Sequence, residues 1–139
     1  MKELISSLKT KLNTINGIQQ VFMYRDAKPT QYPAIICNWE SLDSSFETTD
    51  ENKKRAVFNL YIVVNVARKT MQDIDETVIP NAFDLVSAYF DENWNFGTNV
   101  DGHRVWTQLS LANSQISVED KSKLAYLECV LEIDYLKDN

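Results

Sequence analysis

The segment that decides the fold is residues 55–66, which read Arg-Ala-Val-Phe-Asn-Leu-Tyr-Ile-Val-Val-Asn-Val. Its apolar side chains recur at every second position: Phe58, Leu60, Ile62, Val64 and Val66. The positions between them mix polar with apolar residues. Because successive side chains of a strand point to opposite faces, residues 55–68 are predicted to form a long strand with one face in the core.

A second long strand is predicted near the C-terminus. Between residues 123 and 136 the apolar series is Ala125, Leu127, Cys129, Leu131, Ile133 and Tyr135. Residues 104–118 are expected to form the other arm of a hairpin, with its turn at 119–122. Shorter strands are predicted at 21–24 and 34–39.

Two amphipathic helices are predicted from apolar residues spaced three or four apart. The first covers residues 2–15. The second covers residues 71–90, and its predicted core stripe is Met71, Ile74, Val78, Ala82, Leu85 and Tyr89. Thr70 and Asp73 favour a capped helix start. Pro80 lies inside this helix and removes one backbone bond, so we expect a kink or two abutting helices.

These elements predict one α+β domain over residues 1–139, in the order α-β-β-β-α-β-β. The expected architecture is an antiparallel sheet of about four to five strands with the helices packed on one face. A chain of 139 residues is long enough to fold around one core without disulfides or metal. The predicted core is Leu8, Leu12, Phe58, Leu60, Ile62, Leu85, Leu127, Leu131 and Ile133.

In residues 40–54 the apolar residues show no helical or strand spacing, and the segment is rich in Ser, Thr, Asp and Glu. They are predicted to form a projecting loop between two strands. Structureless segments of this length are uncommon in compact domains and are often functional. Phe46 is its only large aromatic residue, and Lys53, Lys54 and Arg55 form a basic cluster at its end.

No constellation of residues favours catalysis or a cofactor. The single histidine, His103, has no second histidine with which to bind a metal. The glycines are too far apart for a phosphate-binding loop. Acidic residues at 73–76 are explained by a helix N-terminus, and those at 128–134 by a solvated or interface-facing strand. The sequence therefore predicts a protein that is not an enzyme and that carries no catalytic, cofactor or metal site.

The charge distribution and the setting of the cysteines indicate where the protein is made and which classes of partner it can bind. The net charge is −6, and residues 70–103 contain acids but no Lys or Arg. Phosphate backbones would repel such a surface, so specific nucleic-acid binding is not expected. No apolar run has membrane-spanning length, and no signal core is present, so synthesis in the cytosol and no membrane contact are expected. Cys37 and Cys129 stand in apolar runs and are predicted to be buried free thiols.

Exposed aromatic residues on the outer sheet face and in loops predict contacts with other proteins. The candidate interface residues are Glu40, Asp43, Phe46, Glu47, Asp50, Glu51, Lys53, Lys54, Arg55, Tyr61, Trp94, Phe96 and Tyr126.

Four features together resemble one family. They are the strand entry Tyr32-Pro33-Ala34-Ile35-Ile36, the polar segment before Phe58–Val63, the acidic helix after it, and the closing hairpin from Val105 to Tyr135. In this order they resemble the tail terminator, or tail-to-head joining, proteins of long-tailed bacteriophages. The similarity covers essentially the whole chain, and the order of elements carries most of it.

The resemblance implies a structural role in the virion, at the head-proximal end of the tail. Such proteins form a homohexameric ring that caps the tail tube, stops its growth and offers its other face to the head-side connector. DNA passes through the ring without specific binding. Assembly would take place in the host cytoplasm.

Two other functions remain open at the level of sequence. One is another head–tail neck or completion protein of similar fold. The other is a small cytosolic adaptor that binds a peptide or subunit at an exposed sheet edge.

Overall fold

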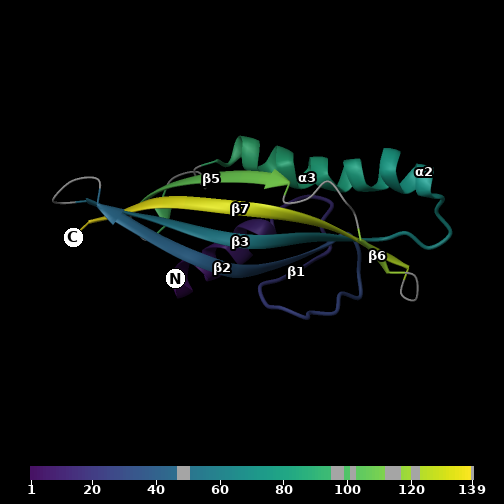
Figure 1. Cartoon of the computed structure of the whole chain (residues 1–139), viewed down its shortest axis with the longest axis horizontal. Coiled ribbons are helices and arrows are strands. Elements are labelled where there is room, and N and C mark those ends of the chain that lie inside the picture. Colours follow the sequence, from purple (N-terminus) through teal and green to yellow (C-terminus); the bar gives the residue numbers. More distant parts are fainter. Residues whose placement is uncertain (47–50, 95–98, 101–102, 112–116, 120–122, 139) are drawn as a thin grey trace.

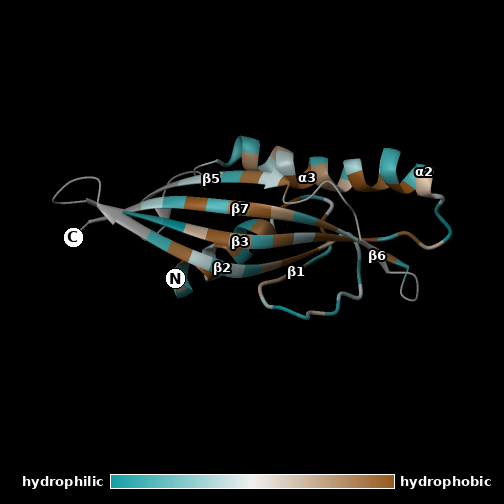
Figure 2. Cartoon of the chain, viewed as in Figure 1, coloured by the Kyte–Doolittle hydropathy of each residue, from teal (hydrophilic) through white to brown (hydrophobic). Residues whose placement is uncertain are grey.

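The centre of the molecule is the pairing of its two longest strands, β3 (Glu51–Asn65) and β7 (Leu124–Asp138). They run antiparallel, in register from Glu51 opposite Asp138 to Asn65 opposite Leu124. The computed structural model describes residues 1–46, 51–94, 99–100, 103–111, 117–119 and 123–138 (Figure 1). Apolar and polar bands alternate along both strands (Figure 2), as the two predicted long strands require.

The sheet has the order β1-β2-β3-β7-β5-β4, and β6 also pairs with β7. Its remaining strands are β1 (Gln20–Phe22), β2 (Ala34–Phe46), β4 (Asn99–Val100), β5 (His103–Leu111) and β6 (Ser117–Glu119). Both β5 and β6 pair antiparallel with β7, which confirms the C-terminal hairpin. One pairing differs from the predicted antiparallel sheet: β1 lies parallel to β2. The segment between them carries the chain back to the end of the sheet where β1 began, so the sheet is mixed.

Both predicted helices pack on one face of this sheet. They are α1 (Lys2–Leu12) and the long helical segment that consists of α2 (Met71–Asp73), a π turn (Ile74–Val78) and α3 (Ile79–Glu92). Their buried residues share one core cluster with the inward side chains of β2, β3 and β7. The architecture is therefore a single α+β domain with a helix layer on one side. No helix in the described part of the chain is long and apolar enough to span a membrane.

The π turn changes which residues of the second helix enter the core. The N–H of Ile79 bonds to the carbonyl of Ile74, five residues back. This wider turn lies directly before Pro80, which has no N–H to give to an ordinary helical bond. The added residue rotates the stripe, so the buried positions are Ile74, Ile79, Ala82, Val86 and Phe90. Of the predicted stripe, Ile74 and Ala82 are buried, and Val78 and Tyr89 are half-buried against the core. The prediction was wrong for Met71 and Leu85, which are 58% and 37% exposed.

The predicted loop at residues 40–54 is largely strand. β2 continues to Phe46 and β3 begins at Glu51, with Asp43 opposite Arg55. This hairpin end extends past both helices, next to the C-terminal end of β7 (Figure 1). A ladder of backbone hydrogen bonds needs no apolar side chains, and no helix covers this end. The sequence therefore lacks the alternation that marks a half-buried strand.

The two cysteines are buried and free, as predicted. Both lie opposite Leu60, on either side of β3. They are separated by two strand spacings, about 9.5 Å, which is too far for a disulfide. Burial raises the pKa of both thiols, that of Cys129 to about 11.

Both thiols should fail to react with a soluble disulfide reagent at neutral pH while the protein is folded. The thiolate is the reactive form, and burial removes both charge and access. Absorbance of the released thiol should report almost no reaction in buffer and two thiols per chain in denaturant. Fast reaction in buffer would show that these positions open to solvent.

Leu131→Ala should lower the free energy of unfolding by about 2–5 kcal/mol. Leu131 is fully buried on β7, between Phe58 of β3 and Leu109 of β5. Leu85→Ala is the matched control. It removes the same atoms from a site that is 37% exposed and should cost clearly less. Chemical denaturation measures both. Equal losses would contradict the helix register set by the π turn.

Candidate functional site

Among the described residues, the sheet face opposite the helices is covered at one end only. There the segment between β1 and β2 lies over a small apolar cluster of Ala27, Ile36, Val63 and Leu124. Tyr61 and Tyr126 pack against this cluster and are half-buried. Beyond it, the outward side chains of β3, β7 and β5 form an uncovered surface, called here the outer face. It includes Trp106, which is 37% exposed.

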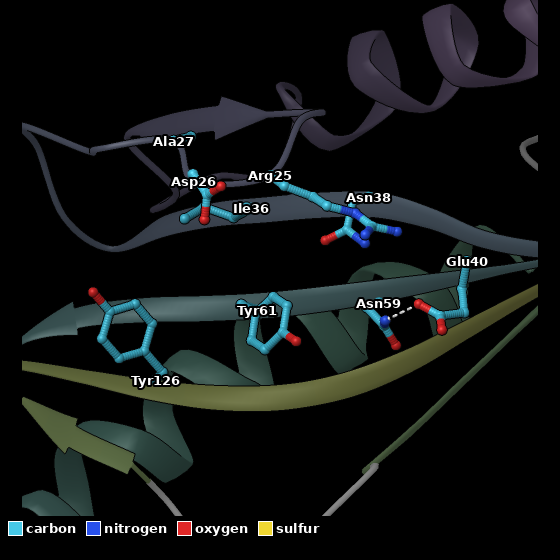
Figure 3. Close-up of a pocket in the computed structure, with 9 residues that line it drawn as sticks. All are labelled: Arg25, Asp26, Ala27, Ile36, Asn38, Glu40, Asn59, Tyr61 and Tyr126. Carbon is cyan, nitrogen blue, oxygen red and sulfur yellow. Dashed lines mark hydrogen bonds between the residues drawn. The ribbon is translucent and has the colours of Figure 1, made fainter.

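A hollow of about 420 Å³ lies where the covered end meets the outer face (Figure 3). Strands β2, β3 and β7 supply its floor, and Arg25, Asp26 and Ala27 come from the segment after β1. The floor residues are Ile36, Asn38, Glu40, Asn59, Tyr61 and Tyr126. Asn38 lies opposite Asn59 in the β2–β3 pairing, so two amide side chains meet there.

Polar contacts hold part of this hollow in place. The Nδ2 of Asn59 donates a hydrogen bond to Oε2 of Glu40. A guanidinium nitrogen of Arg25 lies 3.5 Å from the carbonyl oxygen of Trp39. A register shift between Trp39 and Ser41 brings Glu40 to this place in the β2–β3 hairpin.

Tyr61 is one of the two phenols that line the hollow, and its pKa is perturbed. Its pKa is raised, first by burial and then by the negative charges of Glu128 and Glu40. The phenol also shares a side-chain hydrogen bond with Glu128, whereas Arg25 acts in the opposite direction. The phenol therefore stays protonated and neutral across the physiological range.

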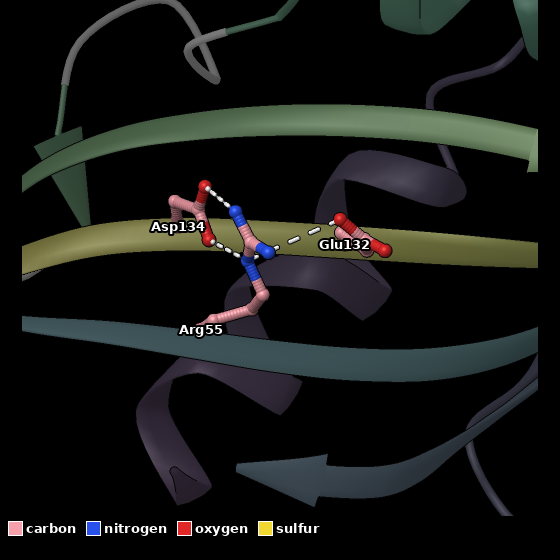
Figure 4. A network of polar contacts seen from close by, with 3 residues as sticks. All are labelled: Arg55, Glu132 and Asp134. Atoms are coloured by element: carbon pink, nitrogen blue, oxygen red, sulfur yellow. Dashed lines mark hydrogen bonds and ion pairs between the residues drawn. The ribbon is translucent and has the colours of Figure 1, made fainter. Parts of the chain in front are cut away.

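A second polar group lies farther along the outer face, on the hairpin end (Figure 4). Arg55 Nε donates to Oδ1 of Asp134 at 2.8 Å, and a second guanidinium nitrogen donates to Oδ2 at 3.1 Å. Glu132 lies 4.0 Å from the same Nε. The hydrogen bond to Asp134, followed by the charges of Asp134 and Glu132, raises the pKa of Arg55. These contacts of Arg55 join β3 to β7 across the face. They give a structural role to Glu132 and Asp134, two of the acidic residues at 128–134.

The predicted interface residues fall into separate groups. Glu40, Tyr61 and Tyr126 line the hollow. Asp43 and Arg55 are cross-strand neighbours on the hairpin end, and Lys53 and Lys54 precede Arg55 in β3, nearer the tip. Phe46 and Glu51 are placed by their backbones as the last residue of β2 and the first of β3. Glu47, Asp50 and Phe96 lie outside the described residues.

Trp94 belongs to neither group. The residue is 49% exposed, and its carbonyl accepts hydrogen bonds from the backbone N–H and the hydroxyl of Thr107. This contact ties the end of the second helix to the edge of β5, so Trp94 lies beside the sheet edge.

Sequence reasoning missed Arg25, Asn38 and Asn59. Arg25 comes from a segment whose path over the sheet depends on the parallel β1–β2 pairing. The two asparagines looked like ordinary outward positions of strands. Their register is the only signal that places them together, and register is a tertiary property.

The described residues contain no group of three or more His, Cys, Asp or Glu side chains arranged to hold a metal ion. His103 is the first residue of β5. The arrangement on the outer face offers hydrogen bonds, aromatic surface and charge, which are means of binding.

A scan against protein-family models and a search of curated proteins found no match to this chain.

Glu128→Gln should lower the pKa of Tyr61, because the phenolate would no longer lie beside a carboxylate. The folded-state pKa exceeds the ordinary value of 10.0. The contribution of Tyr61 to stability is thus fully present below pH 10.0 and is lost as the pH rises above it. The difference in phenolate absorbance between the wild type and Tyr61→Phe isolates this titration.

Asp84→Asn on the helix layer is the control for that titration and should leave the midpoint unchanged. A midpoint equally unmoved by Glu128→Gln would mean that Glu128 does not act on the phenol.

Proposed function

We propose that this protein is a tail terminator of a long-tailed bacteriophage. It forms a ring of identical subunits, in keeping with the hexamers of that family. The ring caps the completed tail tube, stops its elongation and supplies the surface to which the head-side connector attaches. This role involves binding alone and assigns no catalytic residue.

The observation that supports the proposal is that the helices pack on one face of the sheet, whereas among the described residues the outer face has no covering layer beyond the segment after β1. A two-layer domain leaves one sheet face to water or to a partner. Here that face holds Trp106 among paired charges, with the half-buried Tyr61 and Tyr126 at its border with the covered end, a composition typical of protein interfaces. Its hairpin end extends beyond the helices, which provides reach toward a neighbouring subunit or the tube (Figure 1).

The charge of the chain supports the same role. A net charge of −6 disfavours attachment to phosphate backbones. DNA could then pass through the centre of a ring without being held. The protein would act at the head-proximal end of the tail, after assembly in the host cytoplasm.

Deletion of the encoding gene from its phage should yield tails of uncontrolled length and unattached heads. Without a cap, polymerisation of the tube has no physical stop. Electron microscopy of lysates measures the length distribution. Supplying the chain from a plasmid should restore one tail length and joined particles.

The same experiment separates the terminator from a neck protein. Tails of normal length that fail to join heads would indicate a completion protein on the head side. Normal, infectious particles would contradict both roles and favour an adaptor that binds along the edge of β2 beyond its pairing with β1.

A further inference from the structure

Strand β2 forms most of one border of the sheet, because β1 pairs only with its residues 34–36 (Figure 1). Arg25 lies 3.5 Å from the carbonyl oxygen of Trp39, and a register shift follows between Trp39 and Ser41. Beyond that shift β2 continues to Phe46, and no described strand pairs with it on the side away from β3.

The register shows which backbone groups of this edge point outward. The carbonyl of Pro33 accepts a hydrogen bond from the residue before β1, so the even-numbered residues that follow in β2 face β3. Their partners are odd-numbered, which means that the odd-numbered residues of β3 face β2. After the register shift, Arg55 lies opposite Asp43. Asp43 therefore faces β3, and its neighbours Leu42 and Ser44 direct their N–H and C=O groups away from the sheet.

Two apolar side chains lie at the same edge, on the helix side of the sheet. Trp39 and Leu42 stand opposite Phe58 and Ala56, which belong to the core cluster. Opposite residues of neighbouring strands share a face. Trp39 is nevertheless 42% exposed and Leu42 38% exposed. A strand added at this edge would cover both side chains and would bond to the outward backbone groups.

A row of charges on the outer face ends at this edge. Asp43 lies opposite Arg55, which lies opposite Asp134, so the signs alternate from strand to strand. Opposite charges on neighbouring strands are stabilising and like charges are destabilising. The next strand should therefore carry a cation beside Asp43. Lys53 and Lys54 belong to β3, on the inner side of β2, so neither can fill the position beyond Asp43.

Strands of a second copy do not meet these requirements. β2 contains Glu40 and Asp43 but no Lys or Arg, so pairing of two β2 edges would bring like charges together. The opposite border of the sheet, at β5, is already partly closed. β4 pairs with residues 103–104, and the N–H of Thr107 bonds to the carbonyl of Trp94. The charges and the backbone thus favour a strand from a different protein.

We propose that residues 41–46 bind an extended segment of another protein as an additional antiparallel strand. In that segment apolar residues alternate with Lys or Arg. The apolar side chains cover Trp39 and Leu42, and a cation lies beside Asp43. The inference deepens the proposed function and rests on it for the identity of the partner, which would be the tail tube or the head-side connector.

Synthetic peptides of about eight residues, a usual strand length, test the edge on the full chain. The probe alternates Lys with Val and carries a terminal dye, and fluorescence anisotropy measures its binding. In an antiparallel pair the residues opposite Leu42 and Ser44 exchange hydrogen bonds with them, so the Val nitrogens face β2. N-methylation of the Val nitrogens should weaken binding at least about tenfold. N-methylation of the Lys nitrogens, which face away, keeps the same charge and should leave binding unchanged.

Two variants of the chain test the contact from the other side. Ser44→Pro removes an N–H that points away from β3, which an edge strand tolerates, and should weaken binding at least about tenfold. Asp43→Lys places like charges together and should weaken it about five- to tenfold. Ser44→Ala and Asp84→Lys, on the exposed side of α3, are the matched controls and should bind like the wild type. Thermal midpoints show whether each variant is folded, and the N-methylated peptides need no variant.

The proposal is overturned if N-methylation of the Val nitrogens leaves binding unchanged, if Ser44→Pro binds like the wild type, or if the alternating peptide does not bind. Self-association of the wild-type chain that is lost in Ser44→Pro would assign the edge to a second copy and would also overturn it. None of these results decides the terminator role, because tail length in the gene deletion reports on that role separately.

Discussion

The antiparallel pairing of β3 with β7 is the interaction on which the rest of the structure depends. It places the two apolar series on the same side of the sheet, where Phe58 lies opposite Leu131 and Ile62 opposite Leu127. A shift of one residue would turn one whole series toward solvent. Both helices find their apolar surface here, and β2 and β5 extend the sheet from its two edges. The core is therefore a consequence of one register.

The same register arranges the outer face. Every residue between two core positions points away from the helices, so Arg55 meets Asp134 and Tyr61 meets Glu128 by the geometry that pairs the core. The carboxylates of this face thus have partners close by on β3, which is how an acidic strand can lie at the centre of a sheet. The charges of this face are not balanced in the hollow next to the segment that follows β1. There the acids Asp26 and Glu40 lie beside one base, Arg25.

The two ends of the sheet have different physical character. At the end near Val63 and Leu124, apolar packing on both faces makes a layered core. At the hairpin end the chain continues as strand without a covering layer, held by backbone hydrogen bonds and by the Arg55 ion pairs. A rigid base and a projecting hairpin in one element suit a protein that must reach a neighbour while it keeps its own fold. The binding role proposed here relies on that division.

The sequence by itself determined the fold class, the long strands, the one-sided helix layer and the buried thiols. These features depend on local periodicity, which the chain displays wherever an element buries one face. Tertiary structure alone decided the parallel placement of β1, the strand character of residues 40–46 and the position of the hollow. It also decided that Val86 and Phe90 are fully within the core, whereas Tyr89 is half-buried against it and Leu85 is 37% exposed. The physical reason is common to all four: each depends on a pairing register or on a π turn next to Pro80. Neither a register nor an added residue in a helical turn changes the local pattern of apolar side chains.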